Sequence, residues 1–168
     1  MKIEDNFLAQ DDFYELQTFM MGPGDVFPWY YNDTIDHRGQ KDKFMFLHVF
    51  HTGFAPTSSL CVILDPILEI IKPVSIWRIK ANLLPRTPNI VENAFHVDIV
   101  DISKEKLKQW TTSILYVNTN NGYTKFVDGT KVESIANRMV TFPANMKHTG
   151  TSCTDEKTRV VINFNYFK

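Results

Sequence analysis

The sequence contains few cysteines, few glycines and no long apolar run. It has 2 Cys and 7 Gly among 168 residues, and purely apolar stretches such as Cys61–Leu64 are far shorter than the roughly 18 residues of a membrane span. An integral membrane protein is therefore excluded. Cys61 and Cys153 form no Cys-x-x-Cys pair, so we expect free buried thiols rather than a disulfide framework.

Net charge is also nearly absent. The chain has 18 basic and 19 acidic residues, which gives a formal charge of −1, and it has no long run of Lys or Arg. Because proteins that bind nucleic acid by neutralising phosphates usually show a basic excess, we do not expect a nucleic-acid partner. The acidic N-terminus, Met1–Asn6, lacks the apolar core of a secretory signal, so we expect a cytoplasmic protein with no membrane partner.

Aromatic residues are abundant, with 13 Phe, 6 Tyr and 3 Trp in a chain that is 43% hydrophobic. This composition favours an aromatic-rich β core. A length of 168 residues suits one compact domain over residues 1–168.

The N-terminal half contains two expected helices. The first spans Asn6–Met20, with Asp11 as its N-cap and Gly22-Pro23 as its stop. The second is short and runs from Asp65 to Lys72, with a proline in its first turn.

The rest of the chain predicts β structure. Segments rich in β-branched and aromatic residues are separated by Pro, Gly, Asn and Asp clusters, a pattern typical of antiparallel strands. These segments are Phe44–Phe50, Ser75–Leu84, Ala94–Val100, Thr111–Asn118, Tyr123–Val127, Arg138–Phe142 and Thr158–Phe167. The charged segment Ser103–Gln109 is expected to be a solvated loop or one helical turn. Many strands after one or two helices indicate a sandwich or barrel.

Three residues form a candidate metal site. On a strand, His96 and Asp98 would face the same side, so both could bind one metal ion. His148 follows at the edge of another expected strand. Two His and one carboxylate are the facial triad of Fe(II) sites, which leaves coordination positions open, whereas structural zinc sites usually close with four protein ligands.

A candidate anion site accompanies the metal ligands. Arg159 lies on an otherwise apolar strand, where a buried guanidinium is costly unless it meets an anion, and it can clamp a carboxylate with two hydrogen bonds. Tyr116 and Thr112 share a strand face and could add hydroxyl donors. Together these residues predict a pocket for a dicarboxylate with one chelating end.

These motifs resemble those of the Fe(II)- and 2-oxoglutarate-dependent oxygenases, particularly the prolyl-hydroxylase-like branch, including small oxygenase domains of phage or bacterial type. The resemblance covers most of the chain. The matching segments are Asn6–Met20, His96-Val97-Asp98, Tyr116-Val117-Asn118, Gly122–Phe126, Val140–Pro143, His148-Thr149-Gly150 and Arg159.

The resemblance implies a mainly β fold with N-terminal helices, a double-stranded β-helix or jelly roll. It implies that His96, Asp98 and His148 ligate Fe(II) and that Arg159 pairs with the distal carboxylate of 2-oxoglutarate. Tyr116 would bind the same carboxylate, with Thr112 as a further candidate. With O2 as the other co-substrate, and ascorbate as an additional candidate cofactor, such an enzyme hydroxylates a C–H bond and releases succinate and CO2.

The substrate is open at this point. A protein side chain such as prolyl is the first candidate and a small metabolite the second. The strand Trp77–Pro85 lacks the tyrosine that the branch commonly carries there, and Asn82 is a polar substitute. We expect loops at 82–93 and 25–52 to set specificity. The apolar lining is expected to come from residues such as Phe95, Ile114, Phe126 and Val161.

Other polar residues have more ordinary interpretations. The odd separation of His48 and His51 would place them on opposite faces of a strand, in structural roles, and His37 is expected in a loop. Arg78 and Lys80 could meet an anionic substrate, although solvent exposure is the favoured interpretation. The alternative for the whole chain is a catalytically silent metal-binding jelly-roll module, used for ligand recognition or as a virion component, in a bacterial host cytoplasm if phage-encoded.

Overall fold

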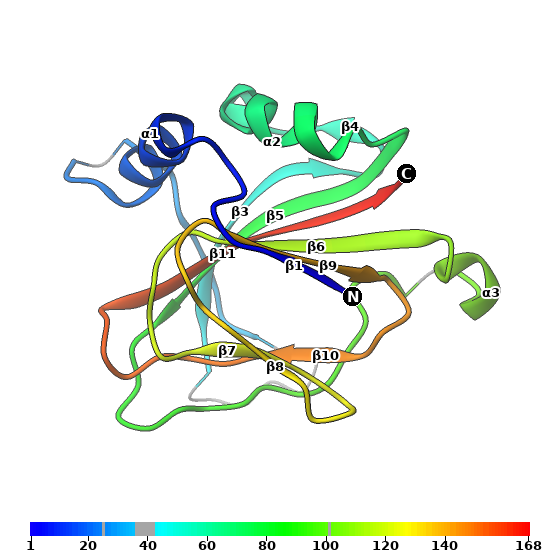
Figure 1. Cartoon of the computed structure of the whole chain (residues 1–168). Helices are drawn as coiled ribbons and strands as arrows, with labels where there is room; N and C mark the ends of the chain where they lie inside the picture. Colours follow the sequence, from blue (N-terminus) through cyan, green and yellow to red (C-terminus); the bar gives the residue numbers. More distant parts are fainter. Residues whose placement is uncertain (25, 36–42, 101) are drawn as a thin grey trace.

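Two antiparallel sheets of unequal size face each other, and helices cover the outer side of the larger one (Figure 1). The computed structural model describes residues 1–24, 26–35, 43–100 and 102–168. His37 and part of the 25–52 segment therefore lie outside the described residues.

The larger sheet has the strand order β1-β9-β6-β11-β5-β3-β2, with β4 paired to β3. Its strands are β1 (Lys2–Glu4), β2 (Tyr30–Asn32), β3 (Met45–Thr52), β4 (Ala55–Pro56), β5 (Ser75–Pro85), β6 (Trp110–Tyr116), β9 (Arg138–Pro143) and β11 (Thr158–Phe167). The smaller sheet has the order β10-β7-β8 and consists of β7 (Tyr123–Phe126), β8 (Lys131–Glu133) and β10 (His148–Gly150).

The helices are α1 (Gln10–Met21), the 3₁₀ helix η1 (Ser59–Leu64), α2 (Asp65–Ile71) and the single turn α3 (Lys104–Leu107). None of the helices in the described ranges is long and apolar enough to cross a membrane. Both cysteines are free thiols; Cys153 is buried and Cys61 is half-buried.

From β6 onward the chain alternates between the sheets. It passes from β6 in the larger sheet to β7 and β8 in the smaller, returns to β9, crosses to β10 and ends in β11. This winding is a double-stranded β-helix, and it confirms the predicted mainly β jelly roll with N-terminal helices.

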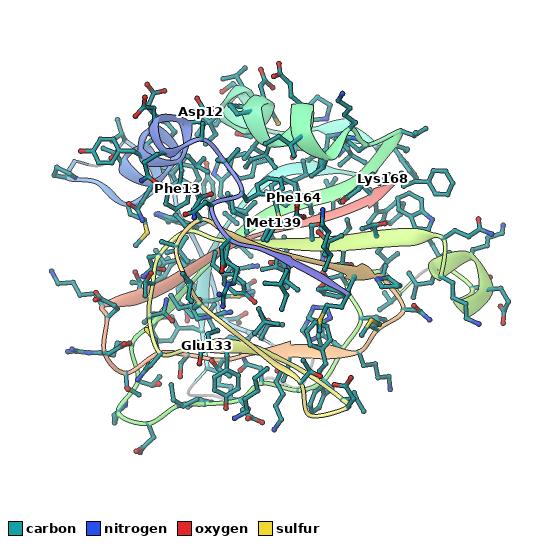
Figure 2. The ribbon with its side chains drawn as sticks, viewed as in Figure 1. Asp12, Phe13, Glu133, Met139, Phe164 and Lys168 are labelled. Atoms are coloured by element: carbon teal, nitrogen blue, oxygen red, sulfur yellow. The ribbon has the colours of Figure 1, made fainter. Side chains whose placement is uncertain are left out.

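The larger sheet is apolar on both faces because each face has its own partner. On the outer face, Phe13 of α1 and Ile67 of α2 pack against side chains that include Met139 and Phe164. Figure 2 shows Phe13, Met139 and Phe164 between the helices and the sheet, with Asp12 on the solvent side of α1. The alternation of strand side chains then sends the next residue of each strand toward the smaller sheet.

A second core fills the space between the sheets. It contains Ile114, Tyr116, Phe126, Val132, Val140, Phe142 and Val161, with Met146 packed at its side. Phe126 and Phe142 meet edge to face, with ring centroids 4.9 Å apart. The aromatic excess of the sequence therefore contributes to the walls of the jelly roll.

Two local predictions were wrong. Helix α1 begins at Gln10 after Ala9, which makes no side-chain cap, and Asp11 lies in the first turn, where a carboxylate favours the helix dipole without capping. Segment 94–100 is not a strand, because only a single bridge, His96 to His148, joins it to β10. Its partner β10 has just three residues, too few to support a longer ladder.

Candidate metal centre and anion pocket

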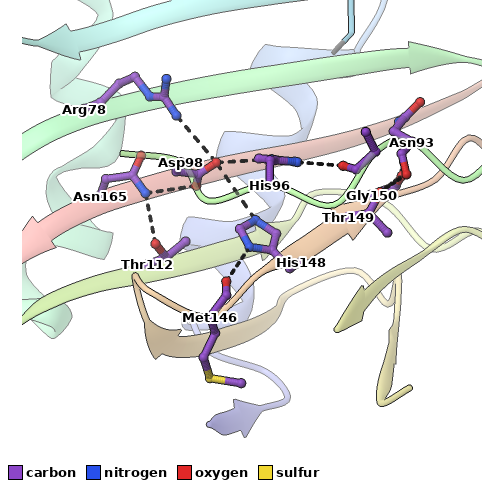
Figure 3. Close-up of polar contacts among 11 residues, drawn as sticks. Arg78, Asn93, His96, Asp98, Thr112, Met146, His148, Thr149, Gly150 and Asn165 are labelled. Atoms are coloured by element: carbon purple, nitrogen blue, oxygen red, sulfur yellow. Dashed lines mark hydrogen bonds and ion pairs between the residues drawn. The ribbon is translucent and has the colours of Figure 1, made fainter. Parts of the chain in front are cut away.

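Three side chains from distant parts of the sequence converge on one point. His96, Asp98 and His148 each offer one ligand atom, and these atoms lie within 4.8 Å of one another. Asp98 Oδ1 is 3.5 Å from His96 Nε2 and 3.9 Å from His148 Nε2 (Figure 3). His148 begins β10, and the bridge between the two histidine backbones brings His96 beside it.

Each imidazole is oriented by a hydrogen bond to the backbone carbonyl two residues before it. His96 Nδ1 donates to Ala94 O at 3.0 Å, and His148 Nδ1 donates to Met146 O at 3.2 Å. Because a carbonyl can only accept, Nδ1 carries the proton and the Nε2 lone pair of each neutral ring faces Asp98. Two lone pairs directed at a carboxylate require a cation between them, either a proton or a metal ion.

Asp98 is held by neutral and cationic donors. Asn165 Nδ2 on β11 donates to Asp98 Oδ2 at 3.0 Å and to Thr112 Oγ1 at 3.1 Å, so the two strands position the carboxylate (Figure 3). Arg78 Nη2 lies 3.6 Å from Asp98 Oδ1. Because Asn165 binds Oδ2, the other oxygen, Oδ1, which is also near Arg78, faces both histidines and the candidate metal position.

The electrostatics keep Asp98 ionised and favour a neutral His148, but they favour a proton on His96. Burial disfavours the carboxylate, yet His96, His148 and Arg78 hold the pKa of Asp98 well below its usual range. Burial lowers the pKa of His148, with Asp98 opposing the change. Burial would also lower the pKa of His96, but Asp98 outweighs it and raises that pKa. A metal ion would replace the proton that Asp98 favours on His96.

The donor set fits Fe(II). Two imidazoles and one carboxylate are the facial ligand set of non-haem iron, and three ligands leave positions for other molecules. The side chains of Asp98 and His148 are 4% and 3% exposed, whereas that of His96 is 45% exposed. The site is therefore anchored in the protein on two sides and open to solvent on the third.

A buried guanidinium lies beyond the metal centre. Arg159 is 2% exposed, and burial lowers its pKa. Its Nε donates to Ser134 Oγ at 3.2 Å and its Nη2 to Thr124 Oγ1 at 3.4 Å. Over the ranges that the structure describes, no carboxylate forms an ion pair with Arg159. A buried, unpaired charge is costly, so this arrangement favours an anionic ligand.

The neighbours of Arg159 extend the anion pocket. Thr124 Oγ1 accepts from the Tyr116 hydroxyl at 2.8 Å as well as from Arg159, so its own hydrogen remains to be donated. A Cβ added to Gly122 would lie 2.6 Å from Arg159 Cδ, which explains why a glycine stands there.

The register of the smaller sheet relates the two sites. His148 pairs with Phe126, and Gly150 pairs with Thr124. Thr124, at the anion pocket, is therefore two residues, or about 7 Å, along the sheet from the level of His148. One small molecule can reach from the metal to Arg159.

Thr112 does not belong to the anion pocket. It pairs with Asn165, six residues along β11 from Arg159, and its hydroxyl accepts the Asn165 amide beside Asp98. Tyr116 is opposite Val161, toward the Arg159 end of the strand. Thr112 and Tyr116 do share a face of β6, as expected. However, four residues of strand separate them too widely for both side chains to bind one carboxylate.

The residues expected to form the apolar lining of the pocket are also only partly brought together. Ile114, Phe126 and Val161 are buried between the sheets, whereas Phe95 is 41% exposed. Phe126 and Phe142 contact the ring of His148, with centroids 6.2 and 4.9 Å away. The metal centre therefore has an apolar wall on its His148 side.

Two further histidines of the described ranges, His48 and His51, lie on β3 and do not belong to the triad. His48 is 3% exposed and bonds Pro28 O and Ser58 Oγ, each at 2.9 Å. A bulge in β3 places His51 opposite Ile79, as His48 is opposite Ala81, so the two share a face. The expected opposite faces were wrong because the bulge adds one residue to the count.

Sequence reasoning missed Asn165 and Ser134. It did single out the cationic residues of β5 as candidate contacts of an anionic substrate, although it favoured solvent exposure. The sequence does contain a signal for Asn165, because Asn163 and Asn165 are polar residues that alternate with apolar residues in β11. Arg78 and Lys80 were expected in solvent, but Arg78 contacts Asp98 and both side chains are partly buried. Burial and the charges of Arg78 and Asp98 set the pKa of Lys80 at about 8.

No protein-family model matches the sequence, and the curated proteins include no match to it. Solved structures do match. A prolyl hydroxylase from Trichoplax adhaerens, in complex with a hypoxia inducible factor peptide fragment, is 13% identical, with a TM-score of 0.68 over 99% of this chain and 82% of that one.

Two further structures are similar. A Pseudomonas putida prolyl-4-hydroxylase is 13% identical, with a TM-score of 0.60 over 99% of this chain and 92% of that one. HygX from Streptomyces hygroscopicus, with nickel and 2-oxoglutarate bound, is 8% identical, with a TM-score of 0.61 over 98% and 81% of the two chains. The chain therefore has the jelly-roll fold of prolyl hydroxylases and other Fe(II)- and 2-oxoglutarate-dependent oxygenases.

Proposed function

We propose that this protein is a non-haem Fe(II)- and 2-oxoglutarate-dependent dioxygenase that hydroxylates a C–H bond of a protein side chain or small metabolite. The observation that carries the proposal is the pairing of two sites. Within the described ranges no carboxylate pairs with the buried Arg159. Its hydrogen-bond partner Thr124 lies about 7 Å along the smaller sheet from the level of His148 in the His-Asp-His triad. That spacing suits a short dicarboxylate that chelates a metal at one end.

His96, Asp98 and His148 would hold Fe(II), and the observed donor set fits that ion. When bound, Fe(II) with 2-oxoglutarate and O2 supplies an overall reaction in which a C–H bond becomes C–OH while 2-oxoglutarate becomes succinate and CO2. The fold positions the protein groups that would hold the metal and the 2-oxoglutarate.

The protein groups divide the work between two ends of the pocket. At the metal end, the carbonyls of Ala94 and Met146 hold each Nδ1 proton, so both Nε2 atoms stay available. At the far end, Arg159 supplies parallel N–H donors and Thr124 supplies a hydroxyl to the distal carboxylate. Tyr116 orients that hydroxyl through its 2.8 Å hydrogen bond.

The apolar core between the sheets keeps water out of the space between these ends. Phe126, Phe142 and Val161 are buried, and the first two contact the His148 ring. A dry wall strengthens the charge interaction of Arg159 with a carboxylate and protects a reactive centre from side reactions.

The substrate is expected to enter from the exposed side of His96. The loops expected to set specificity meet at one cavity of about 130 Å³, which Phe44, Arg86 and Val91 help to line. The Trichoplax adhaerens neighbour is in complex with a peptide. A prolyl or other protein side chain is therefore one candidate substrate, and a small metabolite is the other.

Succinate release tests the proposal without knowledge of the substrate. We expect the wild-type protein with Fe(II), O2 and 2-oxoglutarate to form succinate slowly, and Arg159→Ala to need at least about tenfold more 2-oxoglutarate, the loss of a charged hydrogen-bonded pair. Lys108→Ala, which removes an exposed cation before β6, is the control.

The outcomes separate two functional classes. Succinate formation that depends on Arg159 supports an oxygenase. If the triad binds metal but neither 2-oxoglutarate binding nor succinate formation is detected, the protein is instead a catalytically silent metal-binding jelly-roll module. Equal loss of metal and 2-oxoglutarate binding in Arg159→Ala would show that Arg159 is structural.

A further inference from the structure

The face of β5 that is turned toward the metal centre carries two cations and an amide, Arg78, Lys80 and Asn82. Arg78 pairs with Asn165 and Lys80 with Asn163 in the register of β5 and β11. Because opposed residues of antiparallel strands point to the same side, Lys80 faces the same side as Asn165, which binds Asp98. Figure 3 shows Arg78 directed from β5 at Asp98.

Lys80 is the residue of this face without a partner. It is partly buried, and no hydrogen bond or ion pair to its ammonium group is formed by residues in the described ranges. Its charge acts on both Asp98 and His96, which places it beside the metal centre. Two cations at alternate positions of one strand face repel each other, so the pair is unfavourable without an anion.

The surrounding amides are also incompletely bonded. Oδ1 of Asn82 and Oδ1 of Asn163 are buried and lack a partner among the described residues, as does Nε of Arg78. Buried polar atoms without a partner are rare and call for a ligand or an ordered water. Arg78 Nε can donate to an anion, and the two amide oxygens can accept from a hydrogen-bond donor on the same ligand.

We propose that Lys80 and Arg78 bind a carboxylate of the prime substrate next to the metal. This inference rests on the proposed function and adds the chemical class of its substrate. The charges support it. With Fe(II), Asp98, Arg159 and doubly charged 2-oxoglutarate in place, the opposite charges of those four cancel, and both cations of β5 remain uncompensated.

The two anions occupy different ends of the site. The distal carboxylate of 2-oxoglutarate is assigned to Arg159 at one end of β11, whereas Lys80 pairs with Asn163, four residues further along that strand. A substrate carboxylate at Lys80 therefore lies on the β5 side of the metal, beside the exposed His96. It comes either from a free amino acid or related acid, or from an acidic side chain of a peptide.

Binding measurements test the inference without turnover. The full-length protein, loaded with Mn(II) and saturating 2-oxoglutarate, is titrated calorimetrically with free L-amino acids and with their amides. A second arm uses end-blocked tripeptides that carry Asp, Glu, Asn, Gln or Pro in the centre. The variants are Lys80→Met, Lys80→Arg and the surface control Lys108→Met, an exposed lysine before β6.

We expect at least one carboxylate compound to bind the loaded wild-type protein, and both its amide and Lys80→Met to reduce the affinity by about tenfold or more, as for a lost charged hydrogen bond. Lys80→Arg restores binding, and Lys108→Met leaves it unchanged. If the free amino acids bind, the substrate carboxylate belongs to a free acid. If the acidic tripeptides bind, it belongs to a peptide side chain.

The inference is overturned if no carboxylate compound binds the loaded wild-type protein, if amides bind as tightly as acids, or if Lys80→Met binds normally. It is also overturned if Lys80→Met weakens 2-oxoglutarate binding as much as substrate binding, because the cations then serve the co-substrate. Failure of the proposed function is distinct, since the wild-type protein would then fail to bind Mn(II) with 2-oxoglutarate at all.

Discussion

Asp98 is the residue on which the metal centre depends, because every other member of the site contacts it. Both histidines direct Nε2 at it, Arg78 approaches Oδ1, and Asn165 binds Oδ2. An ionised carboxylate with a side chain only 4% exposed is stable only among such partners. The same partners select which oxygen faces the metal.

Asn165 positions Asp98, so its loss is expected to weaken metal binding. We predict that Asn165→Leu lowers Fe(II) affinity by about 10- to 100-fold, the usual effect of removing a hydrogen bond to a metal ligand. Asn163→Leu, on the same face of β11 but without a bond to Asp98, is the control. Anaerobic metal titration measures both. Equal affinities for the two variants would remove Asn165 from the account.

Lys80 is expected to destabilise the ligand-free protein. Burial and the charge of Arg78, with Asp98 opposing them, lower the folded-state pKa of Lys80 to about 8, below the roughly 10.4 of an unfolded lysine. Between these values the unfolded chain binds more protons, so this group makes stability rise with pH from about 8 to about 10.4. The charge of Lys80 also acts on His96, where it opposes the increase in pKa that Asp98 causes.

We therefore predict that Lys80→Met raises the melting temperature at pH 7 by at least about 2–4 °C, the effect of 1 kcal/mol in a domain of this size. The gain should shrink as pH increases through 8 and disappear near 10.4. Thermal unfolding across this pH range tests it. A variant that is less stable at pH 7 would show that Lys80 supports the fold.

At the scale of elements, strand register brings the two ends of the pocket together. β7 and β10 set Thr124 two residues from the level of His148, and β11 carries both Arg159 and Asn165. The long strands were predictable because each contains a long run of apolar and β-branched residues, in which the pattern of a strand can be recognised. The three-residue strands β1, β8 and β10 were missed, since three residues show no period.

The site was predictable to a similar depth. Two histidines, a carboxylate and an arginine have a chemistry that residue type alone reveals. The hydrogen bonds from Asn165 to Asp98 and from Arg159 to Thr124 depend on register between strands, which no local pattern encodes. His96 and Asp98 converge although their segment is not a strand, because one bridge to His148 is enough to orient it.

Gly122 tests the role of the turn that supports Arg159. An alanine Cβ there would approach Arg159 Cδ to 2.6 Å and Ser152 O to 2.7 Å. We predict that Gly122→Ala weakens 2-oxoglutarate binding by about tenfold or more, by displacing a charged donor, with a smaller effect on Mn(II) affinity. The control is Gly129→Ala, where φ is +90° but nothing lies within 4 Å of the added Cβ.

The comparison of the two glycine variants separates displacement of Arg159 from backbone strain. Isothermal titration with 2-oxoglutarate in the presence of Mn(II) supplies both affinities. If Gly129→Ala weakens 2-oxoglutarate binding as much as Gly122→Ala does, general destabilisation explains the effect and the turn has no specific role.

At the scale of the whole molecule, the larger sheet separates stability from chemistry. Its outer face packs on α1 and α2, and its inner face contributes Asn165 to the metal site and Arg159 to the anion site. The helices therefore stabilise the sheet without touching the pocket. The site on the inner face retains unpaired polar atoms and cations that cost stability in the absence of ligands.

This division predicts that the outer core changes stability alone. Ile67→Ala in α2, at a fully buried position, should cost about 2–5 kcal/mol of unfolding free energy and leave the metal and 2-oxoglutarate affinities of the folded protein unchanged. Ile70→Ala, at a 49% exposed position of the same helix, should cost less than about 0.5 kcal/mol. Urea unfolding with parallel ligand titrations measures both. A loss of affinity in folded Ile67→Ala would show that the two faces are coupled.

The central claim is that one site holds Fe(II) and 2-oxoglutarate together. An anaerobic titration of the Fe(II)-loaded protein with 2-oxoglutarate tests it most directly, through the metal-to-ligand charge-transfer absorption of the complex. We predict the band in the wild-type protein, its absence in Asp98→Ala, and at least about tenfold more 2-oxoglutarate for half-saturation in Arg159→Ala. A wild-type protein without the band, or an Asp98→Ala variant that retains it, would contradict the account.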